Sequence, residues 1–304
     1  MSAKTANKKA KSRQVEPALR ATTESSFTDF IGKLEEDLGG RIGVYAFTEA
    51  SSNQLVRAPL AHRSNERFSM ASTFKWMLAA AVLQKVDARE LNLEQPIAYT
   101  KNDIISWAPV TEKALDQKTG TGSLSLREML QASVQWSDNP ASNLLIKMVD
   151  GPSGLTAFAR TIGDESTRLD RWELELNENA PGDVRDTTTP VAMAHSLQSV
   201  LGASASPSAG VLSPESRKFL VRLMSENQTG GARFRAGLPP QTLVADKTGS
   251  GPRGAINDIG FFELPSGERV YLVVYQSGSQ RSFAELERVH ARVAKYAYQL
   301  YSAD

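Results

Sequence analysis

The stretch FSMASTFK at residues 68–75 runs directly into the apolar stretch WMLAAAVL at residues 76–83. Residues three apart share one face of a helix, so the spacing predicts that Lys75 lies one turn from Ser72, within reach of its hydroxyl. A hydroxyl, an ammonium and free backbone N–H groups are poor material for a core. They suit an activated nucleophile beside an anion-stabilising site, and we expect the rest of the chain to be arranged around this helix.

Composition limits the classes of protein to which the chain can belong. Its 304 residues suffice for one large domain or two smaller ones with a substantial core. The formal net charge is +1, so no overall field attracts nucleic acid or an anionic membrane. Cysteine is absent, which excludes disulfides, thiol nucleophiles and cysteine-bound zinc. The histidines stand far apart in the sequence, so we expect neither a metal site nor a Ser-His-Asp triad from His62, His195 and His290.

Residues 1–24 form a basic segment that no apolar segment follows. They resemble the charged opening of a secretory signal without its hydrophobic region, and the simpler interpretation is a disordered tail. We also expect no membrane span. The alanine-rich helix near residue 79 is too short for one and carries Lys75 and Lys85 at its ends.

Periodicity predicts helices and strands in a definite order. Apolar residues recur at helical spacing over residues 27–38 and again over 286–300. Strand character appears at 41–47, with a partner at 53–59, and returns at 242–245, 257–264 and 269–276. A Pro-Ser-Gly turn at 265–267 joins the last two strands into a hairpin, whereas the middle of the chain is helical and rich in loops.

This order predicts an α/β (α+β) fold with two subdomains. Residues 25–68 and 222–304 would form an antiparallel sheet from both termini, flanked by helices. Residues 69–221 would form an inserted all-helical domain, and the active site would lie between the two.

Three further segments carry side chains suited to chemistry. Ser137-Asp138-Asn139 precedes a proline and reads equally well as a helix N-cap or as a proton-shuttling hydroxyl with a substrate-holding amide. Lys247, Thr248 and Ser250 follow the strand at 242–245 and would grip a carboxylate, and the intervening glycine would permit a close approach of the backbone.

The last segment runs from Arg171 to Asp186, which could pair across the base of an Ω-type loop. Inside it, the stretch RWELELN at 171–177 places a carboxylate next to a tryptophan and an amide, where they could orient a water. The alternative is an exposed acidic loop.

Taken in order, the four segments resemble the class A serine β-lactamases, whose signature combines S-x-x-K, S-D-N and K-T-G. The resemblance runs from about Phe27 to the C-terminus. It implies that Ser72 is the acylated nucleophile, that Lys75 is its proton partner and that Ser137 passes a proton to the leaving nitrogen. It also implies that Glu173, held with Asn177, activates the deacylating water.

The resemblance assigns substrate-binding roles as well. Asn139 would bind the substrate's side-chain amide. Lys247, Thr248 and Ser250 would bind its carboxylate, and the backbone N–H groups of Ser72 and Ser250 would form the oxyanion hole.

At two further positions the match to the family pattern is less direct. Trp107 stands where the family carries an aromatic residue at the lip of the cleft, although simple packing would also explain it. Many members have an arginine a few residues after the K-T-G motif, but Ile256 stands there in this chain. Arg233 resembles the alternative arginine of other members, with Arg235 as the nearest rival.

The resemblance implies a small-molecule β-lactam substrate, no cofactor, no nucleic-acid partner and a monomer in the periplasm or secreted from the cell. Two rivals stay open at this point, a penicillin-binding D,D-peptidase and a non-hydrolytic β-lactam-binding domain. The loop around Glu173 favours the hydrolase, because such peptidases generally lack it.

Overall fold

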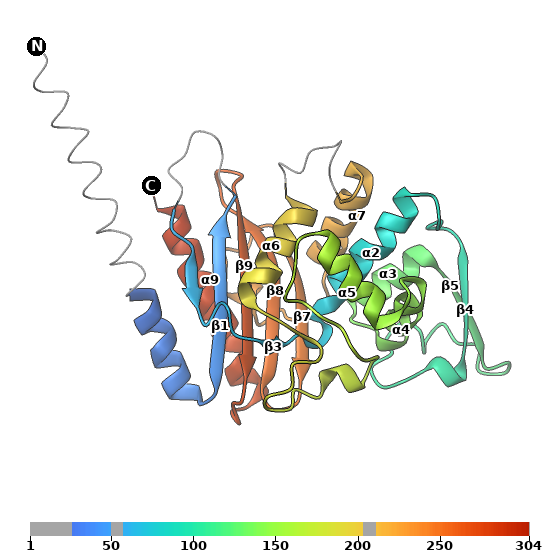
Figure 1. Ribbon diagram of the computed structural model, residues 1–304, viewed down its shortest axis with the longest axis horizontal. Coiled ribbons are helices and arrows are strands. Elements are labelled where there is room, and N and C mark those ends of the chain that lie inside the picture. Colours follow the sequence, from blue (N-terminus) through green and yellow to red (C-terminus); the bar gives the residue numbers. More distant parts are fainter. Residues whose placement is uncertain (1–25, 50–56, 203–210, 304) are drawn as a thin grey trace, which may run out of the picture.

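The computed structural model describes residues 26–49, 57–202 and 211–303, so the predicted basic tail at 1–24 lies outside the described residues. Its main sheet has five antiparallel strands in the order β2-β1-β9-β8-β7. Its strands come from both ends of the chain, as the sequence predicts (Figure 1). They are β1 (Arg41–Thr48), β2 (Leu60–His62), β7 (Val244–Gly251), β8 (Ala255–Glu263) and β9 (Arg269–Ser277).

Both faces of this sheet are covered. Alternate residues of a strand point to opposite faces, and in β9 the side chains of Leu272 and Val274 join one core while Val273 and Tyr275 join the other. We call the core that contains Leu272 and Val274 the outer core and the other the inner core. The outer core is completed by the helix over residues 26–38, by α8 (Phe234–Gly237) and by α9 (Phe283–Ser302). The inner core is shared with the helical part of the chain.

Helix α2 (Lys75–Asp87) runs through the middle of the helical part, and all of its residues from 75 to 83 are buried. A helix that is apolar on every side must be surrounded. In Figure 1 it lies among its neighbours between the sheet and the β4–β5 ribbon. The other helices of this part are α3 (Leu126–Gln135), α4 (Asn139–Met148), α5 (Gly151–Thr161), α6 (Pro190–Leu201) and α7 (Pro214–Ser225).

The inserted part is not purely helical. It also carries two short antiparallel pairs, and the 3₁₀ turns η1 (Ala71–Phe74), η2 (Lys101–Asp103) and η3 (Glu175–Asn177). One pair joins β4 (Pro96–Thr100) to β5 (Thr121–Ser125), and the other joins β3 (Phe68–Ser69) to β6 (Thr187–Thr188). Helix α6 packs on β1 and β9. The division at residues 69 and 221 stays a prediction.

Three local expectations need correction. The second strand was expected at 53–59, but residues 57–59 are not in a strand and 53–56 lie outside the described residues. Strand β2 instead begins directly after Pro59, which has no N–H to donate to a ladder. Strand β7 continues through the K-T-G motif instead of ending at Ala245. Ser72 lies in η1, one turn before the α-helix.

No helix in the described ranges is long and apolar enough to cross a membrane. The same ranges contain no group of three or more His, Asp or Glu side chains that could hold a metal ion.

Candidate active site

Ser72 lies in a turn that is anchored to the sheet beneath it. The neighbouring Thr73 hydroxyl donates to the Met70 carbonyl at 2.8 Å and lies 3.0 Å from the Tyr275 hydroxyl of β9. The Asn257 amide of β8 donates to the same Met70 carbonyl at 3.1 Å. The turn is therefore fixed on one side, while the Ser72 side chain is only half-buried.

Lys75 is fully buried, and four oxygens surround its ammonium. Its Nζ lies 2.8 Å from the Ser137 carbonyl, 2.5 Å from Asn139 Oδ1, 3.1 Å from Glu173 Oε1 and 3.5 Å from Ser137 Oγ. An ammonium has three donors, so acceptors outnumber donors here. No hydrogen bond joins Lys75 to the Ser72 hydroxyl among the described contacts, so the direct pairing expected from the spacing is not present in this arrangement.

Glu173 is held from both ends. Its Oε2 accepts a hydrogen bond from Asn177 Nδ2 at 2.5 Å. Its backbone N–H donates to Asn143 Oδ1, and its carbonyl accepts from Asn143 Nδ2, each at 3.0 Å. Asn143 was not predicted as a site residue. The available signal was its position four residues after Asn139, on the same face of α4.

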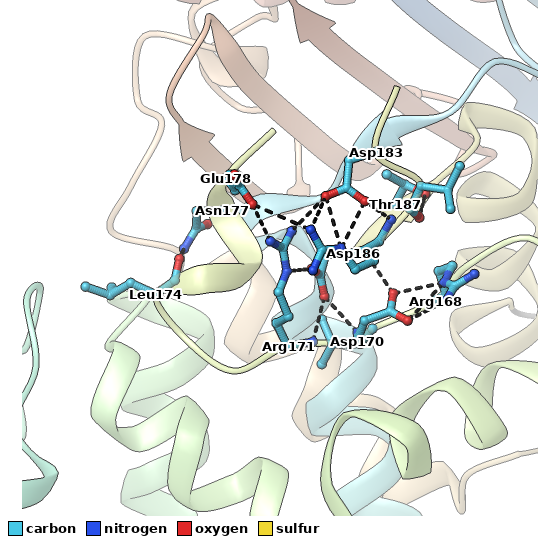
Figure 2. A network of polar contacts seen from close by, with 12 residues as sticks. Arg168, Asp170, Arg171, Leu174, Asn177, Glu178, Asp183, Asp186 and Thr187 are labelled. Carbon is cyan, nitrogen blue, oxygen red and sulfur yellow. Dashed lines mark hydrogen bonds and ion pairs between the residues drawn. The ribbon is translucent and has the colours of Figure 1, made fainter. Parts of the chain in front are cut away.

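The Ω loop is closed at its base by Arg171 and Asp186, as predicted. Arg171 Nε lies 2.6 Å from Asp186 Oδ2, while Asp186 Oδ1 accepts the backbone N–H groups of Asp170 and Arg171 (Figure 2). The Asp186 carbonyl also accepts the Met70 N–H at 3.0 Å, two residues before Ser72. One residue therefore ties the loop that carries Glu173 to the turn that carries the nucleophile.

Within Ser137-Asp138-Asn139, the capping and the functional interpretations apply to different residues. Asp138 is the N-cap of α4 and also accepts the backbone N–H groups of Val110 and Thr111 at 3.0 Å. Ser137 and Asn139 face the buried lysines instead. Ser137 Oγ lies 3.1 Å from Lys247 Nζ and 3.5 Å from Lys75 Nζ, so one hydroxyl lies between two ammonium groups.

Two buried lysines in one cleft disfavour each other's charge. Burial lowers the pKa of Lys75, and the carboxylate of Glu173 opposes this effect. The pKa of Lys247 lies well below its ordinary value because the side chain is buried and because Lys75 repels its charge. Both shifts make a neutral amine easier to form than in water, which is the state that can accept a proton.

Strand β7 lies at the edge of the sheet and passes close to the nucleophile turn. A Cβ atom on Gly249 would lie 2.7 Å from the Met70 carbonyl oxygen and 3.2 Å from the Ser72 nitrogen, so only glycine permits this approach. Thr248 Oγ1 is 2.5 Å from Thr229 Oγ1 in the neighbouring loop. The backbone of the motif at Gly249 thus lies beside the backbone of the nucleophile turn.

The two candidate arginines lie in different places. Arg233 is buried and donates to Ser250 Oγ at 2.8 Å and to the carbonyls of Gly249 and Asn257 at 3.1 and 2.6 Å. Arg235 instead pairs with the buried Asp246 at 2.5 Å. Arg233 is therefore the cation that lies against the proposed carboxylate-binding segment.

Trp107 is 60% exposed and lies next to Asn139. Its carbonyl accepts the Asn139 N–H at 3.0 Å, and its Nε1 donates to the Trp136 carbonyl at 3.0 Å. Its ring thus offers an open apolar face near the amide of Asn139, and packing in a core does not explain its position.

Comparisons with known proteins place the chain in a family. The model of the β-lactamase enzyme family matches residues 26–301. The carbapenem-hydrolysing β-lactamase KPC of Klebsiella oxytoca is 42% identical over 266 residues, which is 87% of this chain and 85% of that protein.

Solved structures give the same result. The class A β-lactamase of the last common ancestor of Gram-negative bacteria superposes with a TM-score of 0.83 at 42% identity, covering 91% of this chain and 99% of that one. A putative class A β-lactamase, PenP of Rhodopseudomonas palustris, gives 0.82 at 39% identity, covering 90% and 99%. The chain therefore belongs to the class A serine β-lactamases, and it is a hydrolase that acts on β-lactams.

Proposed function

We propose that the protein opens the β-lactam ring of penicillins and cephalosporins through an acyl-enzyme on Ser72, which a water activated by Glu173 then hydrolyses. The observation that carries this proposal is the position of the Glu173 carboxylate. One of its oxygens lies 3.1 Å from Lys75 Nζ and the other is held by Asn177. A fixed, buried carboxylate beside the nucleophile's lysine suits a general base.

In the first step, Ser72 Oγ attacks the lactam carbonyl and loses its proton. The new C–O bond forms first and gives a tetrahedral oxyanion. The C–N bond then breaks as the oxyanion collapses, and the leaving nitrogen receives a proton through Ser137. The backbone N–H groups of Ser72 and Ser250 would stabilise the oxyanion, and donors of this kind are worth about 3–4 kcal/mol each. Lys75 or Glu173, acting through water, would take the serine proton.

In the second step, Glu173 removes a proton from water as the water attacks the ester. The ester C–O bond then breaks, the proton passes on to the Ser72 oxygen, and the opened product leaves. Splitting one amide hydrolysis into two steps replaces a high barrier with two lower ones. The substrate carboxylate would lie against Lys247, Thr248 and Ser250, with Arg233 behind them. Asn139 would hold the side-chain amide, and Trp107 would border the entrance of the cleft.

Mass spectrometry of a Glu173→Gln variant mixed with benzylpenicillin tests the proposal. The amide keeps the shape but cannot take the proton from water. We expect a persistent adduct of one substrate mass on Ser72 in the variant and a transient one in the parent. Turnover of a chromogenic cephalosporin by the variant at the parental rate would remove Glu173 from this role.

The same measurement addresses the rivals. A persistent adduct in the parent would indicate a penicillin-binding peptidase, and no adduct at all would indicate a non-hydrolytic domain. The similarity to hydrolases along nearly the whole chain disfavours both. Because the Klebsiella oxytoca relative is named for carbapenem hydrolysis, a carbapenem belongs in the same assay.

We also propose that the protein acts as a monomer in the periplasm or outside the cell, where its class typically meets β-lactams. Light scattering during size-exclusion chromatography and fractionation of expressing cells test the two statements.

A further inference from the structure

A cavity of about 590 Å³ lies between the second half of the Ω loop, the strand β3 and one end of the main sheet. None of the residues given a catalytic or substrate-binding role above is among the described residues that line it. We name it the arginine cavity, because its walls include Arg41, Arg67, Arg171, Arg185 and Arg253. Only two carboxylate residues line it, so positive charge is in excess.

Three of these arginines already have acidic partners. Arg41 pairs with Glu66 at 3.0 Å, Arg171 pairs with Asp186 at 2.6 Å, and Arg185 pairs with Asp183 at 2.8 Å. These pairs neutralise part of the wall, and Figure 2 shows how the Arg171 and Asp183 groups converge.

The other two arginines donate only to neutral acceptors. Arg67 bonds to the Ser166 carbonyl at 2.8 Å and to Thr187 Oγ1 at 3.1 Å. Arg253 bonds to the Glu178 carbonyl. Neither guanidinium has a carboxylate within ion-pair distance in the described part of the chain. Two charges without counter-ions thus border one cavity.

Ser69 supplies an independent observation. It lines the cavity, it is 6% exposed, and its hydroxyl has no hydrogen-bond partner among the described residues. A buried hydroxyl without a hydrogen-bond partner is unfavourable, so such a group calls for a partner. The oxygen itself is covered by neighbouring atoms, so the Ser69 side chain would rotate to donate to an oxyanion in the cavity.

We propose that the arginine cavity binds a small dianion, a phosphate or a dicarboxylate. The planar guanidinium fork matches the oxygens of both groups and holds them with charge-assisted hydrogen bonds. The volume lies within the usual range for small-molecule sites. This site is distinct from the catalytic cleft, and the inference does not depend on the proposed reaction.

Binding would also stabilise the Ω loop. The cavity is walled by the loop residues Arg171 and Arg185 and, outside that part of the loop, by Arg67 and Ser69 beside β6. A ligand that contacts both walls binds only while the loop is packed, so it raises the stability of the packed state by mass action. The protein should unfold at a higher temperature in the presence of the dianion.

Calorimetric titration with inorganic phosphate, and separately with succinate, tests the proposal at constant ionic strength. We expect saturable binding of at least one dianion to the parent, together with a higher melting temperature. Arg67→Gln and Arg253→Gln should each weaken that binding about tenfold or more, because each removes one charged donor. Arg288→Gln, on the exposed face of α9, is the matched control and should bind as the parent does.

The catalytic cleft also carries cations, so Ser250→Ala provides the second comparison. Binding that survives in Ser250→Ala but is weakened in Arg67→Gln supports the arginine cavity. The reverse pattern places the ion in the catalytic cleft and overturns the proposal, as does equal binding by Arg253→Gln and the parent. Arg253 is exposed, so its variant keeps the test decisive even if Arg67→Gln fails to fold.

Discussion

The Oε1 atom of Glu173 lies 3.1 Å from the Nζ atom of Lys75, and both side chains are fully buried. Each of these groups could serve as the base for Ser72, and they lie within reach of one another. Removing either one leaves the other as an uncompensated buried charge, which costs about 3–5 kcal/mol. Single substitutions at these positions therefore alter both the chemistry and the stability, whereas their neighbours offer cleaner tests.

The hydrogen bond from Asn177 to Glu173 should matter mainly for deacylation. Asn177→Ala removes a donor to a carboxylate, an interaction worth about 1.5–3 kcal/mol, so deacylation should slow by about 10- to 100-fold. Pre-steady-state kinetics with a chromogenic cephalosporin would separate the two steps. Glu175→Gln, an exposed neighbour in the same loop, is the control. An equal loss in the acylation step would contradict this division of roles.

Loss of Asp186 should release the Ω loop. Asp186→Ala removes the buried carboxylate that pairs with Arg171 Nε and accepts the backbone N–H groups of Asp170 and Arg171, which should cost about 3 kcal/mol of unfolding free energy. Trypsin should then cut within the loop much faster than in the parent. Asp150→Asn breaks only an exposed ion pair and should change the stability by less than about 1 kcal/mol. Equal digestion rates for Asp186→Ala and the parent would refute this expectation.

Steady-state kinetics should distinguish the roles of Arg233 and Arg235, the two arginines near β7. Arg233→Gln removes the donor to Ser250 and should raise KM for penicillins about tenfold, because substrate binding loses a supporting charge. Arg235→Gln should lower the melting temperature, since Asp246 loses its ion-pair partner and keeps only the hydrogen bond from Asn227, while KM stays near the parental value. Steady-state kinetics with thermal melts would check both, and a raised KM in Arg235→Gln alone would reverse the assignment.

The lowered pKa of Lys247 predicts a specific dependence of stability on pH. Between that lowered pKa and the ordinary value of 10.5, the unfolded state binds more protons than the folded state. The stability contributed by this group therefore rises with pH across that interval, by up to about 1.4 kcal/mol per pH unit. Denaturant unfolding of the parent and of Lys247→Met at several pH values up to 10 should show their difference growing in favour of the parent. A constant difference would count against the shift.

Much of this architecture was predictable from local pattern. Helical periodicity predicted α9, and the turn at 265–267 predicted the β8–β9 hairpin, because both signals depend on residues close in the chain. The Arg171–Asp186 pair also followed from the sequence, since opposite charges flanked a compact loop.

The expectations that were wrong concern contacts between segments that are distant in the sequence. The strand at 242–245 was expected to end before the K-T-G segment, yet pairing with β8 keeps that segment in the sheet. Lys75 turns toward Ser137, Asn139 and Glu173 instead of Ser72, and those acceptors come from distant parts of the chain. The spacing of residues along the chain gives little information about contacts between segments that are far apart in the sequence.

The hydrogen bond between the Asp186 carbonyl and the Met70 N–H joins the Ω loop, which carries Glu173, to the turn that carries Ser72. The positions of the groups for acylation and for deacylation therefore depend on each other. A shift of the loop that supplies water would also disturb the turn that supplies the attacking oxygen. Substitutions that loosen this loop to admit bulkier antibiotics should therefore lower the rates of acylation and deacylation together.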